Sequence, residues 1–133
     1  MTKHHNHKPD VPVVKDEDQE QPVASGWRPV FEAIVRAFVS GDYSLRRRVP
    51  CVDVIDEYTA DHIESYIAAY GETLVDLPED TWGTSVSQWM GSYWEVFVDL
   101  WTKESGCSDM VLNIRVYERG STYRFVIHLV YVP

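Results

Sequence analysis

The sequence predicts an α+β fold, with two helices packed on one face of a three- to four-stranded antiparallel sheet that ends in a C-terminal hairpin. Three observations predict it. Two segments before residue 71 carry apolar side chains at the spacing of an amphipathic helix. Residues 93–101 alternate between two faces, as a strand does. Residues 110–133 contain two apolar runs separated by Gly120-Ser121, which predicts the hairpin.

The chain has 133 residues, which is room for one domain. Residues 1–25 are polar, contain three prolines and carry an acidic run, so they are expected to form a disordered tail. Residues 26–133 are then expected to form a single α+β domain. His4, His5 and His7 lie in the tail, where no fold fixes their geometry. We therefore expect no metal site and no cofactor.

The first helix is predicted to begin near Pro29 and to end at Gly41. Val30, Ile34 and Phe38 recur every four residues and form one apolar face. Proline suits a first helical turn, and glycine commonly follows a last one.

Three arginines follow this helix at positions 46–48. Such a trio could hold a phosphate or a carboxylate. The acidic segment that comes next favours a simpler role, in which the arginines neutralise their neighbours.

The second helix is predicted over residues 56–70, with Thr59 as a cap of its main body and Gly71 as its end. Its apolar stripe consists of Ile63, Tyr66, Ile67 and Tyr70. Residues 72–80 predict a short strand that stops at Pro78. Residues 81–92 predict an irregular loop or a short helical turn.

The remaining strands have a core face and a second face. In residues 93–101 the core face carries Trp94, Val96, Val98 and Leu100. A two-residue turn at Gly120-Ser121 sets the register of the hairpin. The opposed core-face pairs are then Val116 with Phe125, Ile114 with Ile127, Leu112 with Leu129, and Met110 with Tyr131.

The second face carries the side chains that could take part in catalysis or binding. The same register places Arg115 opposite Val126, Asn113 opposite His128, and Tyr117 opposite Arg124. The candidate site on this face consists of Glu95, Phe97, Asp99, Trp101, Asn113, Arg115, Arg124 and His128. An Asp–His pair could orient an imidazole as a general base, and the arginines could hold an anion. Aromatic side chains ringed by charge also suit protein binding, and cross-strand ion pairs are ordinary on a solvated face. No catalytic residue is assigned.

The charge distribution narrows the choice of partner. The chain carries a net charge of −9, and residues 53–109 hold thirteen acids against Lys103 alone, a net −12. Such acidity argues against nucleic acid, whose phosphates require positive charge, and fits a basic protein partner. Two widely spaced cysteines, the lack of an apolar run near 18 residues and the lack of a secretory leader predict a cytoplasmic protein that does not enter a membrane.

These observations favour a non-enzymatic protein-binding module of the immunity or antitoxin type. The alternative is a small-ligand enzyme or sensor that uses Asp99, Arg115 and His128. A third hypothesis is a homodimer that buries the second face of each sheet.

The C-terminal part of the chain resembles a family of small uncharacterised bacterial proteins. The resemblance rests on the run WMGSYWEVFVDLW at residues 89–101, on the Ser108-Asp109 pair, and on the ending IHLVYVP. Thr102, Glu104, Gly106, Val111 and Leu112 add to it. It covers residues 82–133, could extend to the helices from Trp27, and implies a shared fold. It carries over no catalytic residues.

Overall fold

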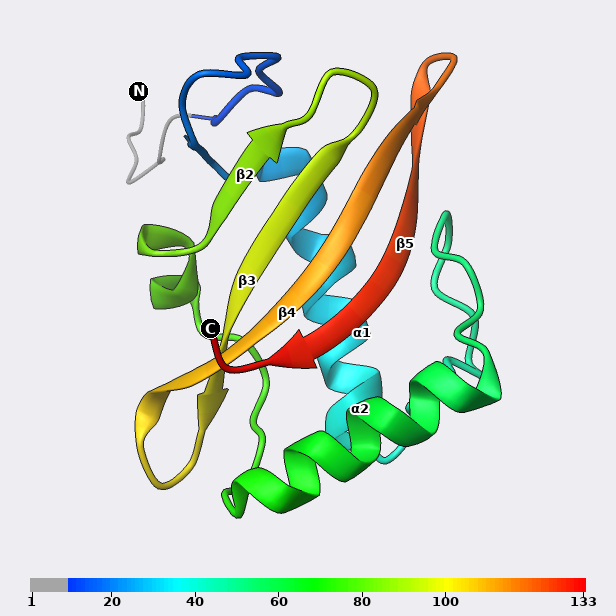
Figure 1. Cartoon of the computed structure of the whole chain (residues 1–133), viewed down its shortest axis with the longest axis vertical. Coiled ribbons are helices and arrows are strands. Elements are labelled where there is room, and N and C mark those ends of the chain that lie inside the picture. The colour runs from blue at the N-terminus through cyan, green and yellow to red at the C-terminus, as the bar shows by residue number, and fades with distance from the viewer. Residues whose placement is uncertain (1–9) are drawn as a thin grey trace, which may run out of the picture.

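The computed structural model describes residues 10–133, so His4, His5 and His7 lie outside the described residues. It contains two α-helices and a five-stranded antiparallel sheet in the order β1-β2-β3-β4-β5 (Figure 1). The strands are β1 (Gln21–Pro22), β2 (Val86–Trp89), β3 (Trp94–Thr102), β4 (Gly106–Arg119) and β5 (Thr122–Tyr131). The predicted α+β class is confirmed, whereas three to four strands was an underestimate.

The structure adds two strands, β1 and β2, to the predicted hairpin of β4 and β5 and its neighbour β3. β2 pairs with β3 from Val86, opposite Phe97, to Trp89, opposite Trp94. β1 is only two residues long and pairs with Ser87 and Val86. Neither has the apolar alternation that marks a strand in a sequence, since β2 includes Ser87 and Gln88 and β1 is polar. Pairing with β3, rather than intrinsic propensity, makes β2 a strand.

Residues 10–25 are packed against the sheet, whereas the sequence predicted a disordered tail over residues 1–25. Val23 and Ala24 are buried. The Trp94 indole N–H donates to the Val14 carbonyl at 3.0 Å, and the Lys15 ammonium lies 5.1 Å from the centroid of the Trp89 ring. Scattered valines and backbone carbonyls thus anchor a segment whose overall composition is polar.

Helix α1 (Arg28–Val39) crosses behind the sheet in Figure 1. Pro29 stands in its first turn, as predicted, and Gly41 follows it with φ of +88°, a conformation that glycine adopts at little cost. The buried face of α1 includes Phe31, whose ring lies 5.6 Å from that of Phe125 on β5. The core therefore lies between α1 and the sheet.

The core face of β3 is as predicted. Its members Trp94, Val96, Val98 and Leu100 are all at most 1% exposed. The pleat sends their neighbours in the strand to the second face, which points away from α1.

Helix α2 (Glu57–Tyr70) lies beside β5 and the lower end of the sheet (Figure 1). Its N-cap is Asp56 rather than Thr59, because the Asp56 carboxylate accepts the Thr59 N–H at 2.8 Å. The hydroxyl oxygens of Tyr66 and Tyr70 accept the backbone N–H groups of Val132 and Asp109, at 3.0 and 3.1 Å. These two tyrosines thus connect the helix to the sheet.

Residues 72–85 form less regular structure than expected. The short strand predicted over residues 72–80 is reduced to one bridge, between Leu74 and Thr102. A 3₁₀ helix, η2 (Glu79–Gly83), follows it and buries Thr81 and Trp82. A short helical turn was one of two alternatives for residues 81–92; η2 covers the first three of these residues, and β2 occupies residues 86–89. No helix among residues 10–133 is long and apolar enough to cross a bilayer.

Both edges of the sheet are partly covered. At the β5 edge, the Phe125 N–H donates to the Cys51 carbonyl at 2.9 Å, and the Asp53 N–H donates to the Phe125 carbonyl at 3.0 Å. The opposite edge ends in the two residues of β1, one of which is Pro22. Very short edge strands, proline and covering loops all hinder strand addition.

The predicted hairpin register is correct from Arg119 down to Ile114, which faces Ile127. A bulge then shifts it, so that Asn113 faces Leu129 and Leu112 faces Val130. The predicted pairs of Leu112 with Leu129, Met110 with Tyr131, and Asn113 with His128 are therefore wrong. The bulge places Val130, which is 1% exposed, in the core, and leaves His128 without a ladder partner.

Candidate functional site

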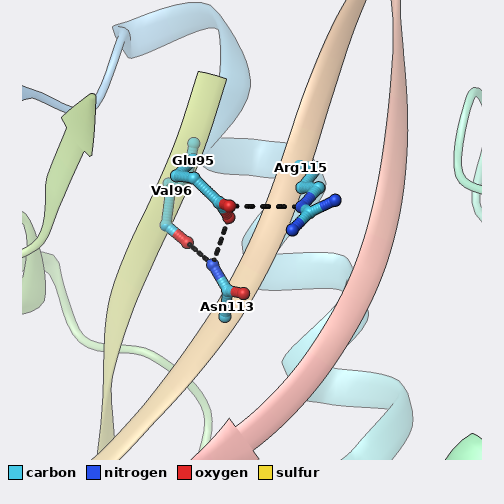
Figure 2. A network of polar contacts seen from close by, with 4 residues as sticks. All are labelled: Glu95, Val96, Asn113 and Arg115. Carbon is cyan, nitrogen blue, oxygen red and sulfur yellow. Dashed lines mark hydrogen bonds and ion pairs between the residues drawn. The ribbon is translucent and has the colours of Figure 1, made fainter. Parts of the chain in front are cut away.

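The centre of the second face is a polar cluster of Glu95, Asn113 and Arg115 (Figure 2). The cross-strand pairing of Glu95 with Arg115, and of Phe97 with Asn113, brings these side chains together. Glu95 accepts from Asn113 Nδ2 at 2.9 Å and from Arg115 Nε at 3.2 Å. Asn113 also donates to the Val96 carbonyl at 3.2 Å. The cluster is a closed network in which each side chain has a partner.

Removing the Glu95 side chain should destabilise the fold. Arg115 Nε and one of the two N–H groups of the Asn113 side chain then lose their acceptor. We expect Glu95→Ala to lower the free energy of unfolding by about 1–3 kcal/mol in urea titrations. A double-mutant cycle with Arg115→Ala should give a coupling of about 1 kcal/mol. The exposed pair of Lys15 and Glu118, at 2.7 Å, is the matched control and should couple more weakly. Equal coupling in both cycles would contradict a special role for the cluster.

Aromatic rings flank the cluster at one end of the face. Tyr93 on the turn before β3 and Tyr117 on β4 have ring centroids 5.4 Å apart. The Arg115 guanidinium lies 5.0 Å from the Tyr93 centroid, and that of Arg124 lies 5.9 Å from the Tyr117 centroid. These distances are within reach of a cation–π attraction. The two arginines are therefore held by rings as well as by carboxylates.

Arg124 forms an ion pair with a carboxylate that does not belong to the predicted site, that of Asp53. Its guanidinium binds both oxygens of Asp53, with Nε 2.9 Å from Oδ1. Hydrogen bonds from Arg124 hold the pKa of Asp53 below its usual value, and the pKa of Arg124 is raised by the same contact. The sequence offered no sign of Asp53, because it belongs to the loop that bridges to β5 rather than to a predicted strand.

Asp99 lies toward the other end of the face and is held by Thr84, whose hydroxyl donates to Oδ2. The β3–β4 register places Cys107 opposite Trp101, beside Asp99. Burial, and then the charges of Asp99 and Asp109, raise the pKa of the Cys107 thiol. Within residues 10–133, no basic side chain forms an ion pair with Asp99.

Trp101 and His128 differ in their surroundings. Trp101 is half-buried and its ring packs beside Gly106, while its indole N–H is buried without an acceptor among the described residues. His128 is exposed, and its side chain makes no hydrogen bond or ion pair within the described part of the chain. The Asp99, Arg115 and His128 side chains thus have separate surroundings, and a carboxylate–imidazole pair is not formed.

Apolar side chains fill the space around the polar cluster. Six of them, from β2, β3, β4 and β5, are half-buried or buried: Val86, Phe97, Val111, Val126, Leu129 and Tyr131. The predicted site on this face included Phe97, the predicted register also placed Val111 and Val126 there, and the pairing of the strands adds the other three. No helix passes in front of this face in Figure 1. The second face is thus an open surface, with a satisfied polar centre and an apolar surround.

Comparison with known proteins identifies the chain's family without assigning an activity. No curated protein and no solved structure gives a significant match. A family model described as a domain of unknown function matches residues 35–133, and so includes α2, the whole of β2 to β5 and the last five residues of α1. The match includes residues 82–133, on which the resemblance in the sequence rests, and it also includes α2, but it begins within α1 rather than at Trp27. The chain belongs to this family, the domain of unknown function DUF7668.

Proposed function

We propose that this chain is a non-enzymatic protein-binding module of the bacterial cytoplasm, of the immunity or antitoxin type, and that its second face docks a basic protein. The observation that carries the proposal is the open, half-buried apolar surround of the Glu95–Asn113–Arg115 cluster. Interfaces with proteins combine such apolar and aromatic anchors with satisfied polar groups.

The partly covered edges of the sheet support a face-on contact. Strand addition is a common way to bind a peptide, and it needs an unpaired edge. Here the Cys51–Asp53 segment occupies part of the β5 edge, and β1 ends in a proline. A partner would therefore meet side chains rather than the backbone.

Charge supports a basic partner. Residues 53–109 carry a net −12, and they include β2 and β3. Glu95 and Asp53 are already paired with arginines, whereas among residues 10–133 the Asp99 carboxylate beside Trp101 is bonded only to a hydroxyl. A lysine or arginine of the partner that reached Asp99 would gain an ion pair without breaking one, and the surrounding acidity would speed association.

A photo-crosslinking amino acid at Val126, on the second face, tests the proposal in cells that express the chain natively. We expect one crosslinked species that contains a basic protein. The matched control carries the same crosslinker at Tyr58 on α2, which is 81% exposed and lies off the face; it should not give that species.

Cysteine alkylation of the same cells gives a second measurement. Cys107 lies on the second face, and Cys51 lies on the loop beyond β5. Docking should slow alkylation of Cys107 relative to the purified protein and leave Cys51 less affected. A crosslink to a second copy of the chain would instead establish the homodimer, and equal crosslinking from Val126 and Tyr58 would refute a specific face.

A further inference from the structure

A cavity of about 770 Å³ lies between α2 and the loop that follows α1, outside the sheet. Ile55 and Ala60 contribute apolar surface to it, and Tyr43 and Ser44 contribute hydroxyls. Its volume falls within the range of small-molecule pockets. Two of the three arginines that could hold a phosphate or a carboxylate, Arg46 and Arg47, line it.

The two elements that border this open cavity bring opposite charges to it, although the loop also supplies Asp42 to its lining. Helix α2 supplies Glu57, Asp61 and Glu64, whose spacing of four and three residues puts them on one side of the helix. The loop supplies Arg46 and Arg47. Within residues 10–133, neither arginine forms an ion pair with any of these three acids, although the charges of both arginines act on Asp42 beside them.

The loop presents its arginines from a fixed backbone. The Asp42 carboxylate accepts the backbone N–H groups of Arg46 at 2.8 Å and Arg47 at 3.0 Å. The N–H groups of Arg47 and then Arg46 hold the pKa of Asp42 below its usual value. Leu45, which lies between Asp42 and Arg46 in the sequence, is 1% exposed and thus anchors the loop in the core. Asp42 is therefore engaged with the loop itself, which leaves the two guanidinium groups available to a ligand.

We propose that this cavity binds a small dipolar molecule, with an ammonium group at the acidic side of α2 and a carboxylate or phosphate at Arg46 and Arg47. A ligand with one charge would be attracted by one element and repelled by the other. A ligand with both charges satisfies the two elements at once, because guanidinium groups bind anions well and carboxylates bind ammonium groups. This site is separate from the second face of the sheet and does not depend on the proposed docking function.

Titration of the full chain with ω-amino acids of increasing length tests the inference. The amino-acid probes are glycine, γ-aminobutyrate and ε-aminohexanoate, and phosphoethanolamine is a further probe with a phosphate in place of the carboxylate. The controls are butylamine and butyrate, each of which carries one of the two charges. Amide chemical shifts in NMR spectra report both affinity and position. We expect one probe length to bind at least about tenfold more tightly than either control, with the largest shifts at Ser44 and Ala60.

Variants on the two sides of the cavity separate a designed site from general electrostatic attraction. Arg46→Gln with Arg47→Gln, and separately Asp61→Asn, should each weaken binding of that probe about tenfold or more. Arg48→Gln and Asp76→Asn change the same types of charge at exposed residues outside the cavity lining and should leave binding unchanged. Circular dichroism checks that every variant is folded. Equal binding of the single-charge controls, equal losses in the control variants, or the absence of shifts at the cavity would overturn the proposal.

Discussion

Replacing Trp94 by alanine should lower the free energy of unfolding by about 3–5 kcal/mol, the largest loss we expect from a single substitution in this chain. Trp94 is 1% exposed at the start of β3. Its ring centroid lies 4.5 Å from that of Trp89, 5.2 Å from that of Trp27 and 5.9 Å from that of Tyr123. Alanine would leave a cavity that these neighbours cannot fill without moving.

The same substitution also removes a hydrogen bond that holds the N-terminal segment. The Trp94 indole N–H is the donor to the Val14 carbonyl, so its loss should loosen the contact of residues 10–18 with the sheet. Trp94→Phe separates the two effects, because it keeps most of the apolar volume and lacks the donor. We expect the phenylalanine variant to lose less stability than the alanine variant and still to release the segment.

Urea unfolding measures the stability, and hydrogen exchange at residues 10–18 measures the release. Trp89→Ala is the control, since Trp89 is only half-buried and contacts the same Trp94 ring. A cost for Trp94→Ala no greater than that for Trp89→Ala would contradict the central position that we assign to Trp94.

Trp94 illustrates how far the sequence can lead. Alternation in residues 93–101 was enough to place its side chain in the core, because period-two alternation with one buried face specifies which residues point inward. Its hydrogen-bond partner could not be predicted. Val14 lies 80 positions away in a polar segment, and it contributes a backbone carbonyl, which carries no signature of its own in a sequence.

The candidate site was predictable where strands pair regularly and unpredictable where they do not. Glu95 and Arg115 meet because regular pairing places them opposite each other, as counting along the strands implies. His128 was placed one position wrongly because counting assumes one residue against one, and a bulge sets two against one. No glycine or proline near His128 marks that bulge. Asp53 was missed because loop-to-sheet contacts depend on tertiary packing.

Replacing Phe97 by alanine should have the largest effect on docking at the second face, if a basic protein binds there as we propose. Phe97 lies on β3 between Val86 of β2 and Asn113 of β4, and it is half-buried beside the polar cluster. An aromatic residue at the centre of an interface commonly contributes 2 kcal/mol or more, which corresponds to a loss in affinity of about 30-fold. We expect the yield of the Val126 crosslink to fall accordingly.

The effects of neighbouring residues should differ in kind. Asp99→Ala removes the carboxylate without an arginine partner, so it should slow association and reduce its dependence on salt. Trp101→Ala should weaken binding through lost apolar contact. Val39→Ala is the matched control for Phe97, because Val39 is 44% exposed and lies on α1, away from the second face. If Phe97→Ala, Asp99→Ala and Trp101→Ala fold normally and keep the full yield of the Val126 crosslink, the second face is not the docking surface. If only Phe97→Ala and Trp101→Ala reduce the yield, the contact is apolar, and the partner need not be basic.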